Sequence, residues 1–112
     1  MARAAIECEK LGANPAQVTD LLGISLSSHD YVNHSYGPES NISHDHLQRL
    51  DRLLGQFFTY LDKKIGKDQS LVLLTADHGF ANTPEFSKSQ KQDAGRIDSR
   101  KMLEVLNSHL NE

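Results

Sequence analysis

The sequence predicts an α/β fold, namely a parallel βαβ unit with flanking helices. Two short apolar segments, residues 21–26 and 70–75, have the composition of buried strands, and a long amphipathic segment lies between them. A connection of that length joins parallel strands through a right-handed crossover. Because parallel strands end at the same edge of a sheet, we expect the polar residues that follow each strand to meet there.

The amino-terminal part predicts a short helix, then a strand. Residues 2–11 are rich in Ala, Glu and Lys, which favour helix, and Gly12 provides a stop signal. Residues 19–27, TDLLGISLS, favour a strand at 21–26. The polar segment that follows contains Gly37 and Pro38, so we expect it to be a surface loop.

The middle of the chain carries the strongest helical pattern. Ser43 is a favourable N-cap, and the helix should run to Ile65 before Gly66 ends it. Apolar residues recur at spacings of three and four: Leu47, Leu50, Leu54, Phe57, Leu61 and Ile65. This periodicity predicts that one face of the helix packs on the sheet, and the apolar run 71–74 then lies within the second strand, residues 70–75.

The carboxyl-terminal part predicts a long connection and one more helix. Residues 80–96 contain Pro84 and many polar side chains, and loops of that length are usually functional or disordered. Residues 99–109 follow with apolar side chains at helical spacing, which predicts an amphipathic helix.

Composition excludes several classes of function. A chain of 112 residues is long enough for a single unit with a modest core, and its net charge of -3 gives no reason to expect nucleic acid or an anionic membrane as partner. No apolar segment is long enough to cross a membrane, and no targeting signal is evident in this chain. The lone Cys8 cannot form an internal disulfide. The oligomeric state stays open.

Two pairs of candidate metal ligands follow the predicted strands. Asp30 and His34 come after the first strand, and Asp77 and His78 precede the final Gly79 of LVLLTADHG, after the second. Carboxylate oxygen and imidazole nitrogen together suit Zn²⁺ and similar divalent ions. Either pair alone also occurs in an ordinary polar loop or turn. All four on one sheet edge would form one closed structural site, or would supply two ligands to each of two catalytic ions.

Three stretches carry a family resemblance: SLSSHDYVNHSYGPES, RLDRLLGQFFTYLDKKIGK and LVLLTADHG. Their order and spacing resemble the alkaline phosphatase superfamily, in its periplasmic alkaline phosphatase branch related to type I phosphodiesterases and nucleotide pyrophosphatases. The resemblance implies that residues 1–112 are one unit, an internal fragment of a larger catalytic domain with an alkaline-phosphatase-like sandwich. It further implies a periplasmic or secreted protein.

The resemblance also implies a two-zinc phosphomonoesterase that hydrolyses phosphate monoesters through a phosphoenzyme. Asp30 and His34 would bind one zinc, and Asp77 and His78 the other. No catalytic nucleophile is expected in this chain, because the family's Thr or Ser lies upstream, so the isolated chain should be inactive. Two positions depart from the family pattern: His29, where a small hydroxyl residue is more usual, and Asn33, where Gly is usual.

Two alternatives to a phosphomonoesterase stay open. A phosphodiesterase or nucleotide pyrophosphatase of the same superfamily would share both ligand pairs and differ at residues outside this chain. A non-catalytic α/β metal-binding domain would bind one ion or none. The number of metal ions bound per chain would distinguish these readings.

Overall fold

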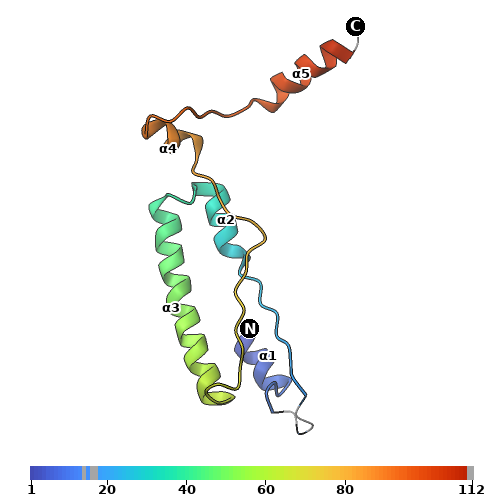
Figure 1. Cartoon of the computed structure of the whole chain (residues 1–112), viewed down its shortest axis with the longest axis vertical. Coiled ribbons are helices and arrows are strands. Elements are labelled where there is room, and N and C mark those ends of the chain that lie inside the picture. The colour runs from blue at the N-terminus through green and yellow to red at the C-terminus, as the bar shows by residue number, and fades with distance from the viewer. Residues whose placement is uncertain (14, 16–17, 111–112) are drawn as a thin grey trace. The chain divides into compact units, whose positions relative to one another are not determined.

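The computed structural model describes residues 1–13, 15 and 18–110, which fall into two units, Met1–Phe80 and Ala81–Glu112. The first unit contains helices α1 (Ala2–Cys8), α2 (Ser27–Tyr36) and α3 (Asn41–Lys64). The second contains α4 (Pro84–Ser89) and α5 (Ser99–Leu110) (Figure 1). None of the helices in these residues is long and apolar enough to cross a membrane.

The predicted sheet is absent from the part of the chain that the structure describes. Residues 21–26 and 70–75 have no regular secondary structure, so the predicted parallel βαβ unit, and with it the alkaline-phosphatase-like sandwich, is wrong for this structure. A strand is completed only by the hydrogen bonds of a neighbouring strand, whereas a helix satisfies its own backbone. Leu21 and Leu73 are 95% and 85% exposed, which no buried strand would allow.

Helix α2 occupies the segment for which the sequence predicted a surface loop. It ends at Gly37, whose φ of 84° lies in the left-handed region and whose N–H donates to the carbonyl of Asn33. Asp30 and His34 are therefore one helical turn apart on the same face. This spacing was visible in the sequence as Asp-x-x-x-His.

Helices α3 and α5 confirm the two amphipathic helices that periodicity predicted. Helix α3 begins earlier than expected, because Ser40 and not Ser43 is its N-cap: the Ser40 side chain accepts the Ser43 N–H at 3.1 Å. The predicted first helix is also confirmed, although it already ends at Cys8. Helix α4 was missed, although Thr83 before Pro84 is a favourable start signal.

Polar contacts fix α2 and α1 against α3. Asn33 of α2 and Ser43 of α3 are buried, and the Ser43 hydroxyl donates to the Asn33 side-chain carbonyl. At the other end of α3, the carboxylate of Glu7 accepts from Tyr60 at 2.6 Å and from Lys64 at 2.7 Å. The first contact holds α2 against α3, and the other two hold α1 against it.

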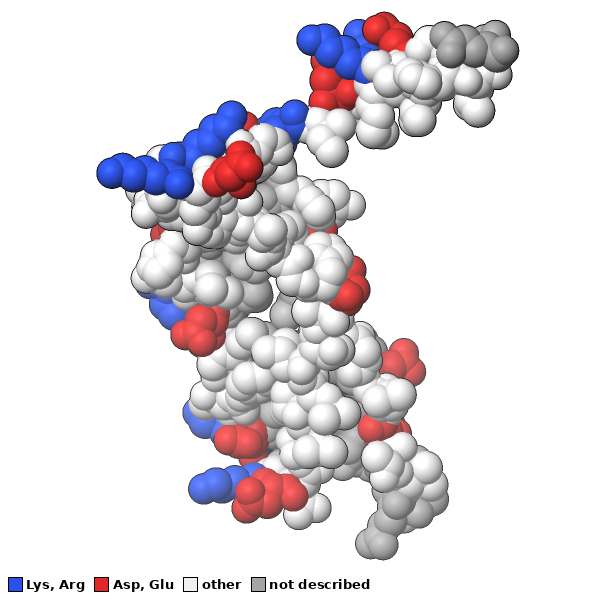
Figure 2. Space-filling model, turned by 45° about the horizontal axis from the view of Figure 1, so that its top comes forward, with Lys and Arg blue, Asp and Glu red and all other residues white. Residues whose placement is uncertain are grey.

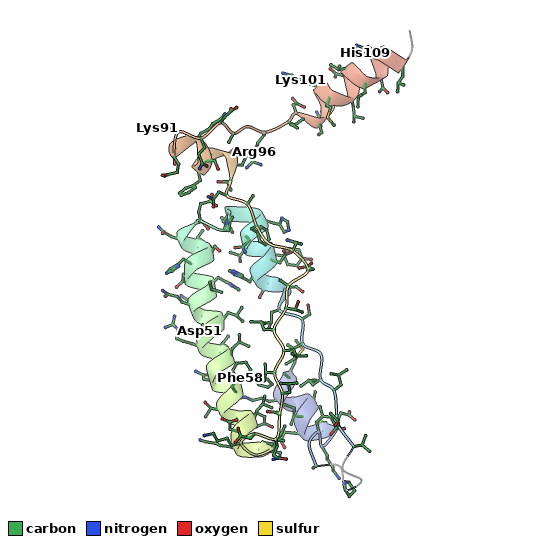
Figure 3. The ribbon with its side chains drawn as sticks, viewed as in Figure 1. Asp51, Phe58, Lys91, Arg96, Lys101 and His109 are labelled. Carbon is green, nitrogen blue, oxygen red and sulfur yellow. The ribbon has the colours of Figure 1, made fainter. Side chains whose placement is uncertain are left out.

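The apolar core of the first unit is small. Among the described residues only Ile6 and Leu61 are buried hydrophobic side chains. An open hollow of about 1140 Å³ is lined by the inner side of α3, including Phe58, and by residues from both apolar segments (Figure 3). On the face shown in Figure 2, uncharged side chains cover most of this unit.

Candidate metal centre

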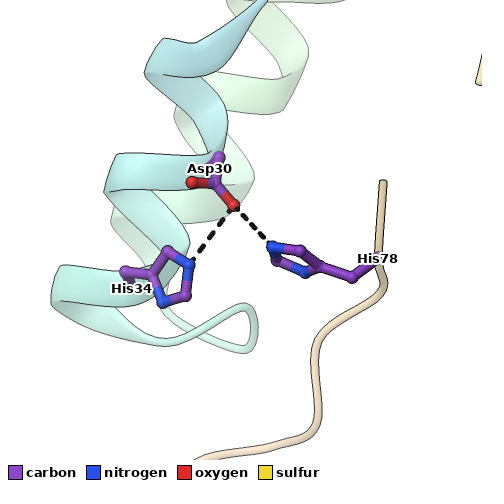
Figure 4. Close-up of side chains that lie close together, drawn as sticks. All are labelled: Asp30, His34 and His78. Atoms are coloured by element: carbon purple, nitrogen blue, oxygen red, sulfur yellow. Dashed lines mark ion pairs between the residues drawn. The ribbon is translucent and has the colours of Figure 1, made fainter. Parts of the chain in front are cut away.

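Three side chains of the first unit converge on one point. Oδ1 of Asp30 lies 3.4 Å from Nε2 of His34 and 3.4 Å from Nε2 of His78 (Figure 4). One ligand atom from each of these residues falls within 4.8 Å of the other two, and they are the one such group of three or more found in the described residues. The three donors come from both of the ligand pairs that the sequence predicted.

Two different elements position these donors. Asp30 and His34 stand on adjacent turns of α2. Asn33, also in α2, holds this helix against α3 through its hydrogen bond with Ser43. His78 comes from the irregular segment that follows the second apolar run. The sequence argument expected this meeting at a sheet edge, and the structure produces it between a helix and an irregular segment.

Hydrogen bonding sets which nitrogen of His78 faces Asp30. Nδ1 of His78 lies 3.0 Å from the carbonyl oxygen of Gly79. A carbonyl can only accept, so Nδ1 carries the proton, and in the neutral ring the lone pair is left on Nε2. The Gly79 carbonyl, followed by the carboxylates of Asp77 and Asp30, raises the pKa of His78 above its ordinary value.

Asp77 stands apart from the three converging donors. Its side chain is 85% exposed, and its Oδ2 lies 3.8 Å from Nε2 of His78. Its Oδ1 accepts the backbone N–H of His78 at 3.1 Å. The carboxylate is thus next to the cluster without belonging to it, and the assignment of Asp77 to a second ion stays a prediction.

The donor set fits a zinc ion. One carboxylate and two imidazoles, all partly open to solvent, are the ligand types of catalytic zinc sites, which leave a position for water or substrate. Two ligands bound at about 2.0–2.1 Å to a tetrahedral ion lie about 3.4 Å apart. Asp30 stands at this separation from each histidine. The ligand atoms of His34 and His78 lie within 4.8 Å of each other, so these two side chains would complete the set by approaching the same ion.

Two further contacts near the cluster escaped the sequence argument. The Phe80 ring packs edge to face against both His34 and His78, at centroid distances of 4.9 and 5.0 Å. His29 of α2 stacks on His46 of α3, with their Nδ1 atoms 3.1 Å apart. An aromatic residue two positions after His78 was the available signal for the first contact. Nothing in the spacing of His29 and His46 signalled the second.

Comparison with known proteins gives a consistent family assignment. The model of the family type I phosphodiesterase / nucleotide pyrophosphatase matches residues 2–102. A protein named calcium-transporting ATPase from Myroides odoratus is 45% identical over 97% of this chain and 20% of its own length. Alkaline phosphatase PhoV from Synechococcus elongatus is 50% identical over 86% of this chain and 17% of its own. Alkaline phosphatase PafA from Elizabethkingia meningoseptica is 45% identical over 85% of this chain and 17% of its own length.

The matches cover most of this chain but only a small part of each relative. The chain spans between 15% and 20% of the length of the curated relatives it matches. No solved structure gives a significant match. The family model nevertheless covers the whole of the first unit from residue 2 onward, including Asp30, His34, Asp77 and His78. The chain therefore belongs to the type I phosphodiesterase / nucleotide pyrophosphatase family.

Proposed function

We propose that this chain supplies metal ligands to a zinc-dependent phosphatase that hydrolyses phosphate monoesters. The observation that carries the proposal is the convergence of Asp30, His34 and His78 in a chain of this family. Three relatives with the name alkaline phosphatase, each between 42% and 50% identical, support the monoester as substrate. A periplasmic or secreted location, implied by the resemblance, belongs to the same proposal.

In this proposal the residues of the chain bind and orient. Asp30 supplies negative charge, His34 and His78 supply neutral nitrogen donors, and the Gly79 carbonyl keeps Nε2 of His78 available. When bound, zinc would polarise a phosphoryl oxygen and lower the pKa of a bound water. Asp77, beside His78, is placed to help bind a second ion of a two-zinc site. The nucleophile, Thr or Ser, would come from outside this chain.

A second candidate function has its own support. The matching family is described by diester and pyrophosphate chemistry, and one relative bears the name of an ATPase. Both suggest cleavage of a phosphodiester or phosphoanhydride bond. In either case these residues would bind the ion that contacts the phosphoryl group, so they do not separate the two candidates.

The first experiment measures zinc binding by competition with a chromogenic chelator. The chain should bind zinc, and Asp30→Asn or His34→Gln should weaken binding about tenfold or more, because each removes one donor from the ion. His44→Gln, a histidine of α3 outside the cluster, is the matched control and should leave binding unchanged. Equal zinc affinity in all four proteins would rule out the proposed site.

The second experiment measures hydrolysis. In a protein that contains these residues within its complete catalytic domain, p-nitrophenyl phosphate should be cleaved and Asp30→Asn should lower the rate by at least about a hundredfold. Residues 1–112 alone should cleave it no faster than buffer with the same zinc. Faster cleavage of bis-p-nitrophenyl phosphate than of the monoester would favour the second candidate. Zinc binding without hydrolysis of any ester would indicate a non-catalytic metal-binding protein.

A further inference from the structure

We infer that Phe80 is a positioning residue, whose ring holds the imidazoles of His34 and His78 in the orientation that metal binding needs. The role in metal binding rests on the proposed function, whereas the ring contacts themselves do not depend on any ion. The Phe80 ring meets the His34 ring at an interplanar angle of 71° and the His78 ring at 65°. The two imidazoles also meet each other edge to face, with centroids 5.7 Å apart.

The three rings form a cluster in which each restrains the others. Aromatic rings favour edge-to-face contact because a positive ring edge meets a negative ring face. An exposed imidazole on a helix otherwise turns between rotamers, and His34 is 59% exposed. With the Phe80 ring against it, fewer of these orientations remain open.

The restraint matters more for His78 than for His34. His34 stands on a helix, whereas His78 belongs to a segment without regular structure, so its backbone is held less firmly. Phe80 is half-buried although residues 70–79 before it are exposed. Its ring adds to the contact between His78 and Asp30 in holding this end of the segment beside α2. Both Nε2 atoms then face the same carboxylate oxygen of Asp30.

Phe80 offers no donor atom to an ion, so it must act through the two histidines. Ligands held in place before the ion arrives bind it more tightly, because less side-chain freedom is lost on binding. The ring also shields one side of the histidine pair from water. Removing the ring should therefore weaken metal binding without removing a ligand.

The first test uses NMR of the histidine ring protons in the metal-free chain. Phe80→Leu should shift the resonances of His34 and His78, because both rings lose a neighbouring aromatic ring, and should leave those of His44 unchanged. Phe58→Leu, the same substitution in α3 of the same unit, is the matched control and should shift neither, because the ring neighbour of Phe58 is Phe57. Unchanged His34 and His78 resonances in Phe80→Leu would overturn the inference.

The second test compares zinc affinity in the same proteins. Phe80→Leu should bind zinc about tenfold more weakly, the lower end of what loss of support around a metal site costs. Phe80→Tyr keeps the ring and should retain the affinity of the unchanged chain. Equal affinities of Phe80→Leu and the unchanged chain, or an equal loss in Phe80→Tyr, would overturn the positioning role. If the unchanged chain bound no zinc, the proposed function would fail, and the NMR result would still decide whether the Phe80 ring lies against the two histidines.

Discussion

Helix α3 and residues 70–76 are both rich in leucine, but only α3 forms regular structure. Helix α3 has a side-chain cap at Ser40, lysines in its last turn and an apolar face directed toward α1 and the hollow. Residues 70–76 form no regular structure, and Leu71, Leu73 and Leu74 are at least 80% exposed. Apolar composition alone therefore does not decide local structure here. The two segments differ in where their backbone hydrogen bonds can be made.

The first prediction compares one leucine from each segment and has the largest expected effect. Leu61 of α3 is buried and Leu73 is 85% exposed. Leu61→Ala should lower the free energy of unfolding by about 2–5 kcal/mol, because it leaves a cavity in a small core. Leu73→Ala should change it by less than about 0.5 kcal/mol. Urea unfolding followed by circular dichroism measures both.

The comparison fails if the two substitutions cost the same. A large cost for Leu73→Ala would mean that this leucine is buried in solution, by a contact that the structure does not contain. A small cost for Leu61→Ala would mean that α1 and α3 do not pack around Ile6 and Leu61. Far-ultraviolet spectra of both variants before urea is added would show whether α3 is still helical.

Signals that act within a few residues predicted three of the five helices in the described residues, namely α1, α3 and α5, but not the fold class. The periodicity from Leu47 to Leu61 predicted α3, and the spacing from Met102 to Leu106 predicted α5. Helix α2 was missed because Gly37 and Pro38 were taken to mark a loop, although Gly37 in fact ends a helix. The strands were wrong because strand formation depends on a partner elsewhere in the chain, which an apolar segment by itself cannot reveal.

In the candidate site too, the sequence predicted the residues but not the structure that brings them together. The motif residues Asp30, His34 and His78 were named from the sequence, and the structure brings them together. The reason given for their meeting, a shared sheet edge, was wrong, because α2 presents Asp30 and His34 instead. Phe80 was not predicted as part of the cluster: its place two residues after His78 was a signal, but the ring contacts depend on how the irregular segment lies beside α2.

The second prediction tests the contact that fixes α2 against α3. Ser43→Ala removes the hydroxyl that donates to the buried side-chain carbonyl of Asn33. The unpaired carbonyl should cost about 1–3 kcal/mol of unfolding free energy. Ser35→Ala, at an exposed position of α2, is the matched control and should cost less than about 0.5 kcal/mol. Urea unfolding of the two variants measures the difference.

A double substitution shows whether the cost belongs to this hydrogen bond. If Ser43 and Asn33 act through each other, Asn33→Ala combined with Ser43→Ala should cost less than the sum of the single substitutions. Additive costs would mean that the two residues stabilise the first unit independently. Because Asn33 lies between Asp30 and His34 on α2, the same variants should also weaken zinc binding if the position of α2 matters to the site.

The smallest predicted effect lies in the second unit, where an ion pair connects a helix to irregular chain. Glu85 in the first turn of α4 accepts two hydrogen bonds from Arg96, at 2.7 and 2.9 Å. The Arg96 guanidinium lowers the pKa of Glu85 from 4.5 to about 2. Residues 70–76 contain no charged side chain that could tie them to a helix in this way. The second unit should therefore respond to acid where that segment does not.

The sign of this response follows from the lowered pKa of Glu85. The pair stabilises the folded state above pH 4.5, and its contribution is lost as the pH falls from 4.5 toward about 2, where the folded carboxylate takes up its proton. An NMR titration of the Glu85 side-chain carboxyl carbon should show the low pKa, and Arg96→Gln should return it toward 4.5. Arg100→Gln, a substitution in α5 outside the pair, should leave the titration unchanged. A Glu85 pKa that is the same in all three proteins would show that the pair does not form in solution, and Arg96 would then not tie the irregular chain to α4 as the structure shows.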